Sequence, residues 1–170
     1  RVMEITKILG EMFSINMSMQ SMDEQVLTNI KRANIKLDHM IEVNDHLRED
    51  GRSTKGELIM PLPGESKETF IKGLNQLINT KVTSITVYTL MMLHGTEFKN
   101  PEYREQFKYK GKYRIVPLNF GEYDGQKIFD YEEVGIETKD LSFKDYLDIR
   151  AIALLVEAIH NGRPFNEFFK

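Results

Sequence analysis

Residues 54–78 read TKGELIMPLPGESKETFIKGLNQLI, and this stretch decides the fold class. Its first seven residues, 54–60, predict a strand that stops at the turn Pro61-Leu62-Pro63-Gly64. Ser66 then predicts the N-cap of a helix over residues 68–78, where apolar side chains recur at helical spacing. A strand that passes directly into an amphipathic helix is the unit from which parallel α/β folds are built.

The same alternation extends on both sides of this stretch. Residues 2–12 predict a helix, and residues 13–19 predict a strand in which apolar and small polar side chains alternate. Residues 84–90 predict a further strand. Strands that alternate with amphipathic helices imply parallel βα units with right-handed crossovers, so we expect three parallel strands covered by helices.

Two helices are expected between the first two strands. Ser21 and Glu24 stand three residues apart before an apolar run, which predicts a capping box. A second helix is expected over residues 37–49, and Gly51 is expected to end it in the left-handed conformation. The first ninety or so residues are therefore predicted to form an α/β unit whose sheet is too small to close on itself.

The pattern changes after residue 98. The later elements are expected to be a short helix opened by Asn100-Pro101, a hairpin of residues 114–122 and 126–131 around Asp124-Gly125, and a helix over 143–160 capped by Ser142 and Asp145. We therefore divide the chain into residues 1–98, which hold the parallel strands, and residues 99–170, a C-terminal α+β extension.

Composition excludes several classes of function. The formal net charge is -3 and the hydrophobic fraction 41%, so neither nucleic acid nor a membrane surface is an expected partner. The longest apolar run, residues 151–156, is too short to span a bilayer, and we expect a cytoplasmic protein. The chain has no cysteine, which excludes disulfides, thiolate zinc sites and thiolate-held clusters; four scattered histidines make a metal site unexpected.

Polar side chains gather where the predicted strands end. In parallel α/β folds, ligands bind at the carboxyl edge of the sheet. Ser18 and Gln20 stand at the end of the first strand and can both donate and accept hydrogen bonds, as a ribose or an amino-acid group requires. The same two residues are equally suited to a structural role, in which they satisfy the strand end and lead into the next helix.

Three short runs resemble motifs of one enzyme family. Ser18-Met19-Gln20-Ser21, followed by Leu27 and Lys31-Arg32-Ala33-Asn34, is similar to the run S-x-Q-S … L … R-x-N. Residues 56–66 are similar to the strand x-D-L-I-x-G-L-P-G-E-T, and residues 85–96 to I-x-V-Y-x-L … L-P-G-T. In this order and spacing the chain resembles radical S-adenosylmethionine (radical SAM) enzymes, most of all the members that carry a cobalamin-binding domain.

The resemblance implies a fold and two cofactors. The three strands would be the last three of a partial (βα)6 TIM-like barrel, so the chain would be the C-terminal portion of a larger enzyme. Family members bind a [4Fe–4S] cluster through a CxxxCxxC loop and cleave SAM reductively to a 5′-deoxyadenosyl radical. Because this chain has no cysteine, we expect the cluster, and cobalamin where it is used, to be held by the rest of the parent protein.

The resemblance also assigns residues to SAM. Gln20 and Arg32 match positions that coproporphyrinogen-oxidase-like members use on SAM, with the guanidinium of Arg32 on the methionine carboxylate. Glu57 matches the carboxylate that binds the ribose hydroxyls, although the family usually has Asp there. The alternative roles are structural: Arg32 as a surface cation near a helix end and Glu57 as a solvated strand carboxylate.

The remaining matches concern the adenine. The stretch from Ile59 to Glu65 matches the strand-to-helix turn that packs near adenine. Tyr88, Thr89 and Leu90 match the last strand, whose backbone groups contact adenine in family members. The Tyr88 side chain is expected to lie in the core. Pro61 replaces the family's Gly and has no amide proton to donate. Gly64 is expected to serve a turn, and Glu65 to favour the start of the following helix.

The functional expectation is therefore part of an enzyme. The parent would use SAM for radical chemistry or methyl transfer on a small-molecule substrate, with specificity in the region from Asn100 onward; the isolated chain is expected to be inactive. One alternative is a non-catalytic α/β module that packs on a partner. Another is a phosphate-binding barrel, for which a Gly-rich turn is missing. An unpaired edge of a partial barrel also predicts self-association through residues 13–19.

Overall fold

The computed structural model describes residues 15–162 and 164, and its first layer is a three-stranded parallel sheet. The strands are β1 (Ile15–Gln20), β2 (Thr54–Met60) and β3 (Ser84–Thr89), in the order β1-β2-β3. Both pairings are parallel, as the sequence predicts. The predicted helix over 2–12 and the start of the strand over 13–19 lie outside the described residues.

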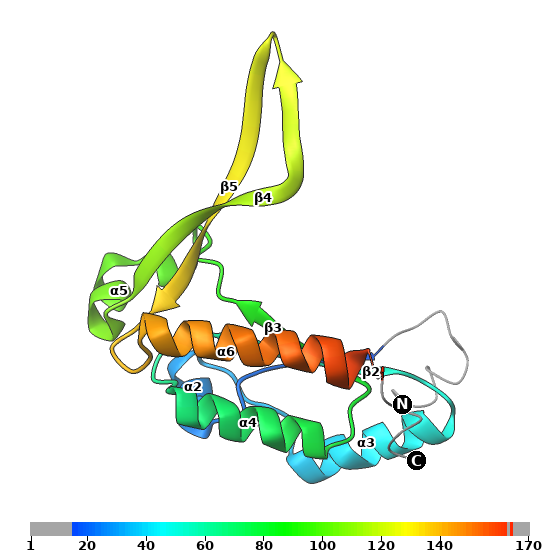
Figure 1. The fold of residues 1–170 in the computed structure, drawn as a ribbon. Helices are drawn as coiled ribbons and strands as arrows, with labels where there is room; N and C mark the ends of the chain where they lie inside the picture. The colour runs from blue at the N-terminus through cyan, green and yellow to red at the C-terminus, as the bar shows by residue number, and fades with distance from the viewer. Residues whose placement is uncertain (1–14, 163, 165–170) are drawn as a thin grey trace.

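Helices cover one face of this sheet (Figure 1). They are α2 (Glu24–Asn29), α3 (Leu37–Glu49), α4 (Lys67–Asn79) and α6 (Phe143–Leu155), which continues as a π-helical turn over Val156–Asn161. The main core lies between helices and sheet, and its largest members include Met40, Leu77 and Ile149. Burial of apolar area on this scale is the main force that stabilises the layer.

The two faces of the sheet differ because side chains alternate along each strand. In β2 the residues at positions 54, 56, 58 and 60 are buried toward the helices, whereas Lys55, Glu57 and Ile59 point the other way and are half-buried. In β3, Ile85 and Val87 are buried in the helix-side core, and Tyr88 is exposed. The second face therefore carries the charged side chains of β2, Lys55 and Glu57, and the exposed Tyr88 of β3.

A second core cluster closes the carboxyl end of the sheet. It joins Val26, Leu62 and Leu90 to Phe107 and Tyr109, which come from α5 (Pro101–Phe107) and the residue that follows its C-cap. The short 3-10 turn Glu97–Lys99 leads into α5. The later part of the chain therefore packs directly on the sheet. Whether residues 1–98 and 99–170 are separate units stays a prediction.

The hairpin is longer than its sequence pattern predicts. β4 (Lys110–Tyr123) and β5 (Gln126–Glu137) pair in antiparallel fashion and project away from the rest of the molecule (Figure 1). Asp124 and Gly125 both have positive φ, 50° and 76°, as a two-residue hairpin turn requires. The prediction of this turn is confirmed, while the sequence pattern missed residues 110–113 at the inner end of β4 and residues 132–137, the inner half of β5.

Most helix termini follow the predicted caps. Ser66 forms a capping box with Thr69 on α4, and Ser142 forms one with Asp145 on α6. Gly51 has a φ of 71° just after α3, and Asn100 caps α5 ahead of its first-turn proline. These four positions confirm the sequence signals on which the helix boundaries were based.

The capping box predicted for Ser21 and Glu24 is wrong. Asp23 is the N-cap of α2, and its carboxylate accepts hydrogen bonds from the amides of Gln25 and Val26. The Ser21 hydroxyl is instead hydrogen-bonded to the buried Glu65. The physical reason is that a carboxylate satisfies the free amides of a helix start equally well, which releases Ser21 for a tertiary contact.

The α/β class and the parallel strands are thus confirmed. The described residues contain three parallel strands, so they do not themselves close a barrel. Within the same residues, no helix combines the length and the apolar character that a bilayer crossing demands.

Candidate functional site

A polar network crosses the face of the sheet that the helices leave uncovered. Ser18 on β1 and Glu57 on β2 are register partners, and the Ser18 hydroxyl donates to Glu57 Oε2. The ammonium of Lys55 lies 3.3 Å from Glu57 Oε1 and donates to the hydroxyl of Tyr88 on β3 at 3.1 Å. Three strands therefore contribute to one cluster of hydrogen-bonding groups, which we call the sheet-face network.

The charges of this network support one another. The hydrogen bond to Tyr88 raises the pKa of Lys55, and its contact with Glu57 acts in the same direction. The Lys55 ammonium also lies 5.6 Å from the centre of the Tyr88 ring, within the range of a cation–π contact. Tyr88 was expected in the core, and that prediction is wrong: the residue is 42% exposed, because its position in β3 points away from the helices.

Two further predicted residues flank the network. Ile59 lies on the same face of β2 and packs against the second core cluster, next to the carboxyl end of the sheet. Gln20 ends β1 with a φ of 65°, and the register of β1 against β2 shifts between Ser18 and Gln20. The Gln20 side chain has no hydrogen-bond partner within residues 15–162, so its amide is available to a ligand.

Thr89 and Leu90 lie apart from the network. The Thr89 hydroxyl is within 3.2 Å of the Tyr146 hydroxyl on α6, so this side chain belongs to the helix side of the sheet. Leu90 is buried in the second core cluster. Its amide donates to Met60 O, and its carbonyl accepts from Gly135, so the backbone of Leu90 is already engaged.

Arg32 lines a different hollow. A groove of about 520 Å³ lies between the segment that follows α2 and helix α4, and its lining includes Met19, Arg32, Lys36 and Gln76. Arg32 is exposed, and the part of the chain that the structure describes offers its guanidinium no ion-pair partner. No contact joins Arg32 to Glu57, so the geometry groups Ser18, Glu57, Ile59 and Tyr88 and leaves Arg32 at a separate position.

A buried carboxylic acid joins the turns that follow β1 and β2. Ser21 and Glu65 are both 1% exposed, and the Ser21 hydroxyl donates to Glu65 Oε1 at 2.6 Å. Glu65 Oε2 is buried without a hydrogen-bond partner among the described residues. Burial raises the pKa of Glu65 to about 8, with a smaller contribution from the charge of Asp23, although the bond from Ser21 opposes the shift.

This acid was expected only to favour the start of α4, and that prediction missed its burial. A protonated Glu65 keeps the two turns together without placing a charge in the core. The contact between Ser21 and Glu65 fixes the turn that follows β1 relative to the turn that follows β2. No local sequence pattern predicts such a pair, because Ser21 and Glu65 are 44 residues apart in the chain.

The turn around Gly64 depends on glycine. Its φ is 86°, and a Cβ there would lie 2.5 Å from Asn29 Nδ2, which donates to Pro63 O at 2.8 Å. The Met60–Pro61 peptide bond at the start of this turn is cis. The expectation that Gly64 serves a turn is therefore confirmed.

Replacing Gly64 with Ala is expected to lower the free energy of unfolding by about 2–3 kcal/mol, from the left-handed φ and the lost Asn29 bond. Gly95→Ala is the matched control, since Gly95 has a φ of 82° but no atom within 4 Å of a Cβ. Urea unfolding of both variants measures the difference, and equal losses would contradict a role for the Asn29 contact.

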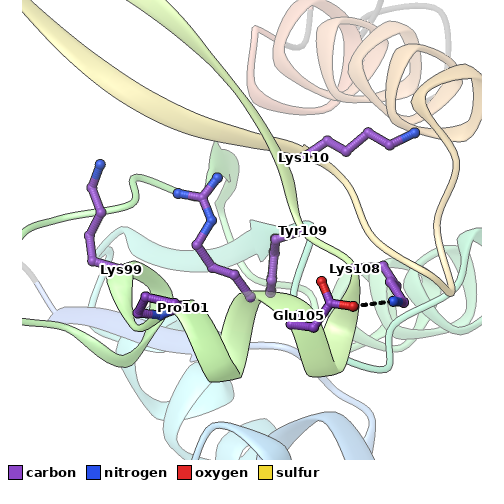
Figure 2. A pocket seen from close by; sticks show the side chains of 7 residues that line it. Lys99, Pro101, Glu105, Lys108, Tyr109 and Lys110 are labelled. Atoms are coloured by element: carbon purple, nitrogen blue, oxygen red, sulfur yellow. Dashed lines mark hydrogen bonds and ion pairs between the residues drawn. The ribbon is translucent and has the colours of Figure 1, made fainter.

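A basic hollow lies beside α5. It has a volume of about 570 Å³ and is lined by Lys99, Arg104, Glu105, Lys108 and Lys110, among others. Figure 2 shows Lys108 paired with Glu105 on the last turn of α5 and Lys110 at the start of β4. The cations here have carboxylate partners: Lys99 and Arg104 bind Glu133, and Lys110 binds Glu137. Most cations of this hollow therefore already have a carboxylate partner within the protein.

The described residues contain no group of three His, Asp or Glu side chains that could hold a metal ion. The whole chain also has no cysteine. Its residues therefore do not fit a [4Fe–4S] cluster, which thiolates hold. The carboxylate and hydroxyl groups of the sheet-face network do fit the hydroxyl groups of a ribose, since they supply acceptors and a donor at hydrogen-bonding separation.

Comparison with known proteins finds two methyltransferases to which the chain is similar. No family model matches the chain. It is 28% identical over 169 residues to the cobalamin-dependent radical SAM methyltransferase TokK of Streptomyces tokunonensis. It is 30% identical over 170 residues to 2-(S-pantetheinyl)-carbapenam-3-carboxylate methyltransferase of Streptantibioticus cattleyicolor. Over nearly its whole length the chain is therefore similar to part of a radical SAM methyltransferase.

Both matches cover 95% of this chain but only 24% of each relative, so the chain spans about a quarter of their length. Among solved structures, coproporphyrinogen III oxidase from Escherichia coli, described as a radical SAM enzyme, is similar with a TM-score of 0.48 and 23% identity. That similarity covers 54% of this chain and 21% of the oxidase.

Sequence reasoning missed two residues of the candidate site. Lys55 stands two residues before Glu57 in β2 and so shares its face, a signal that strand periodicity could have provided. Glu65 gave no such signal, because its role depends on a contact between distant segments.

Proposed function

We propose that this chain supplies part of the SAM-binding wall of a larger radical SAM enzyme. In this assignment residues 1–98 are the C-terminal half of a partial barrel, and residues 99–170 are an extension that borders a small-molecule substrate. When bound, SAM supplies either a radical or a methyl group. We favour methyl transfer, because both curated relatives are named methyltransferases.

The observation that carries this proposal is the contact between Ser18 and Glu57 on the uncovered face of adjacent parallel strands. Lys55 and Ser18 hold the Glu57 carboxylate in place, so it does not have to be ordered when a ribose arrives. Its side chain is 16% exposed, which leaves it accessible yet partly shielded from water. Ile59 beside it offers an apolar surface for adenine.

The backbone of Tyr88 is placed near this surface, since Tyr88 is the register partner of Ile59. Gln20 at the end of β1 is available for the amino-acid part of SAM. Arg32 belongs to this assignment only if the methionine carboxylate extends toward the groove beside α4. Thr89 and Leu90 contribute by shaping the strand end, since their polar groups are engaged within the protein.

The cluster, and cobalamin if it takes part, belong in this proposal to the remainder of the larger protein. The chain itself has no thiolate with which to ligate iron. Its residues act by binding and orienting SAM and by excluding water from one side of it. Shielding and orientation of this kind are what a protein contributes when a cofactor performs the chemistry.

Glu57→Gln in the longer protein that contains this chain tests the proposal. Losing a charge-assisted acceptor is expected to weaken SAM binding by roughly tenfold to a hundredfold. The measurement is anaerobic turnover after cluster reconstitution, with 5′-deoxyadenosine and S-adenosylhomocysteine quantified across SAM concentrations. Both products together favour methyl transfer, and 5′-deoxyadenosine alone favours radical abstraction.

Glu68→Gln is the control, because Glu68 is an exposed carboxylate on α4, outside the sheet-face network. If Glu57→Gln and Glu68→Gln have the same KM for SAM as the unchanged protein, the ribose assignment fails. If the longer protein yields neither product, the alternative of a non-catalytic module that packs on a partner gains support.

A further inference from the structure

One face of the β4–β5 hairpin carries five large apolar side chains. Residues that pair directly across an antiparallel ribbon share a face, as do residues two apart on one strand. Ile115 pairs with Tyr131, and Phe120 pairs with Phe129. Tyr113 precedes Ile115 by two residues and completes the set. We call these five residues the apolar stripe.

The apolar stripe is uncovered along its length. Its members are between 52% and 71% exposed, with Phe129 the least and Tyr131 the most exposed. The rings contact one another within the ribbon, since Tyr113 and Tyr131 have centroids 5.7 Å apart and Phe120 and Phe129 have centroids 6.1 Å apart. The outer part of the hairpin stands away from the sheet and helices (Figure 1), whereas near its root the Lys99 ammonium lies 6.0 Å from the centre of the Tyr113 ring.

Exposure of the apolar stripe to water is unfavourable in free energy. A two-stranded hairpin is marginally stable by itself, and contiguous exposed apolar patches usually mark interaction sites. We propose that the apolar stripe docks on the same stripe of a second copy of this chain. Each copy would present one self-complementary face, which is the arrangement of a two-fold symmetric dimer.

The exposed area matches what a weak dimer needs. Five large side chains at these exposures can bury on the order of 600 Å² per copy, or about 1,200 Å² in total. Specific interfaces begin at about 1,200 Å² in total, so the stripe supports a dimer at the low end of that range. We therefore expect association that depends strongly on concentration.

The charges of the hairpin do not oppose this pairing. Residues 110–137 contain four Lys or Arg and six Asp or Glu, so neither sign dominates the ribbon. Near the tip, Glu122 pairs across the ribbon with Lys127, on the same face as the stripe. A two-fold related copy can place these opposite charges against each other. The other face carries the ion pair of Arg114 with Glu132 and is polar there.

The rival contact for a second copy is the outer edge of β1, where the sequence predicts self-association. β1 has six residues and pairs on one side with β2. Pairing there would add backbone hydrogen bonds but would leave the apolar stripe in water. The two contacts therefore predict protection from hydrogen exchange in different segments.

Sedimentation equilibrium of the 170-residue chain, across a range of concentrations, tests the proposal. The double variant Phe120→Ser, Phe129→Ser is expected to raise the dimer Kd by roughly thirtyfold or more, the loss typical of central aromatic anchors. Tyr123→Ser, Ile128→Ser is the matched control, because these residues are 66% and 46% exposed on the opposite face of the same ribbon. Far-UV circular dichroism checks that both variants keep the fold.

Each outcome supports or contradicts dimerisation through the apolar stripe. A dimer that only the stripe variant weakens, with exchange protection gained in β4 and β5 at high concentration, supports the proposal. A monomer at every concentration overturns it, as does equal weakening by both variants. Protection gained in β1 instead of the hairpin also overturns it. None of these results bears on SAM binding, which the Glu57 variant tests separately.

Discussion

Glu65→Gln is expected to remove most of a strong pH dependence from the stability of this chain. Glu65 is buried, its Oε2 has no partner among the described residues, and burial raises its pKa to about 8 from an ordinary 4.5. The folded chain therefore keeps the proton in a pH range where the unfolded chain has released it. Glutamine has the shape of the protonated acid but does not titrate.

The sign of the effect follows from proton binding. The stabilising contribution of the buried acid is fully present below pH 4.5, where both states hold the proton. As pH rises from 4.5 toward 8, only the folded state binds it, so the free energy of unfolding falls by about 1.4 kcal/mol per pH unit. The contribution is lost once pH passes the folded pKa, and the total loss is on the order of 5 kcal/mol.

Asp23, Tyr109 and Ser21 are the other polar groups that lie near Glu65. Asp23 faces it with a negative charge that helps to keep Glu65 protonated. Tyr109 also lies close, but burial raises its pKa further above its ordinary value of 10, so it stays neutral throughout. The Ser21 hydroxyl favours the charged form and limits the shift. Glu65 is therefore the group in this cluster that titrates between pH 4.5 and 8.

Urea unfolding at a series of pH values from 5 to 9 measures this. The difference in unfolding free energy between Glu65→Gln and the unchanged chain should grow in favour of the variant as pH rises. Glu68→Gln on the exposed side of α4 serves as the control and should show no such trend. Parallel curves for all three proteins would mean that Glu65 is ionised in the folded chain.

The parallel sheet and most helix boundaries could be predicted because their causes are local. Ser66, Ser142 and Asn100 each cap the helix that follows them, and Gly51 ends α3, as short-range patterns indicate. The capping box at Ser21 failed because Asp23, two residues further on, caps α2 instead. The contact of Ser21 with Glu65 was missed because it joins turns that are distant in the chain, and no window of sequence contains both residues.

The candidate site could be predicted only in part. Alternation along the first predicted strand separated Ser18 from its apolar neighbours, and the family resemblance singled out Glu57. The parallel register brings the two residues into contact. Tyr88 was misplaced because an aromatic residue in a strand is usually buried, whereas its register position points to the polar face. Arg32 follows α2 in a turn, where periodicity gives no direction for a side chain.

Glu133→Ala is expected to lower the free energy of unfolding by about 3–5 kcal/mol, the usual result of removing one partner from a buried ion cluster. Glu133 lies at the root of the hairpin, and its side chain is 7% exposed. It binds both Lys99 and Arg104, and with Arg104 the bond is bidentate, at 2.9 and 3.2 Å. Its carbonyl also accepts from Met92.

The charge of Glu133 holds α5 to the root of the hairpin, a contact that we call the junction. Burial by itself would raise the pKa of Glu133, but the hydrogen bonds from Arg104 and Lys99 outweigh burial and hold the pKa below its ordinary value. Removing the carboxylate leaves two cations facing each other with side chains only 27% and 21% exposed. α5 and the hairpin root should therefore open together, which hydrogen exchange can follow residue by residue.

Glu132→Ala is the matched control, one residue away in β5. Its ion pair with Arg114 lies where the arginine side chain is 49% exposed, so its loss should cost less than about 1 kcal/mol. The dependence of the unfolding free energy on salt distinguishes the two variants further. At 1 M salt the screening length falls to about 3 Å, which should remove the small effect at Glu132 but leave most of the effect at Glu133, because the Glu133 side chain is only 7% exposed. Equal losses at both positions, or a Glu133 effect that salt abolishes, would show that the junction is held by packing and not by its buried charge.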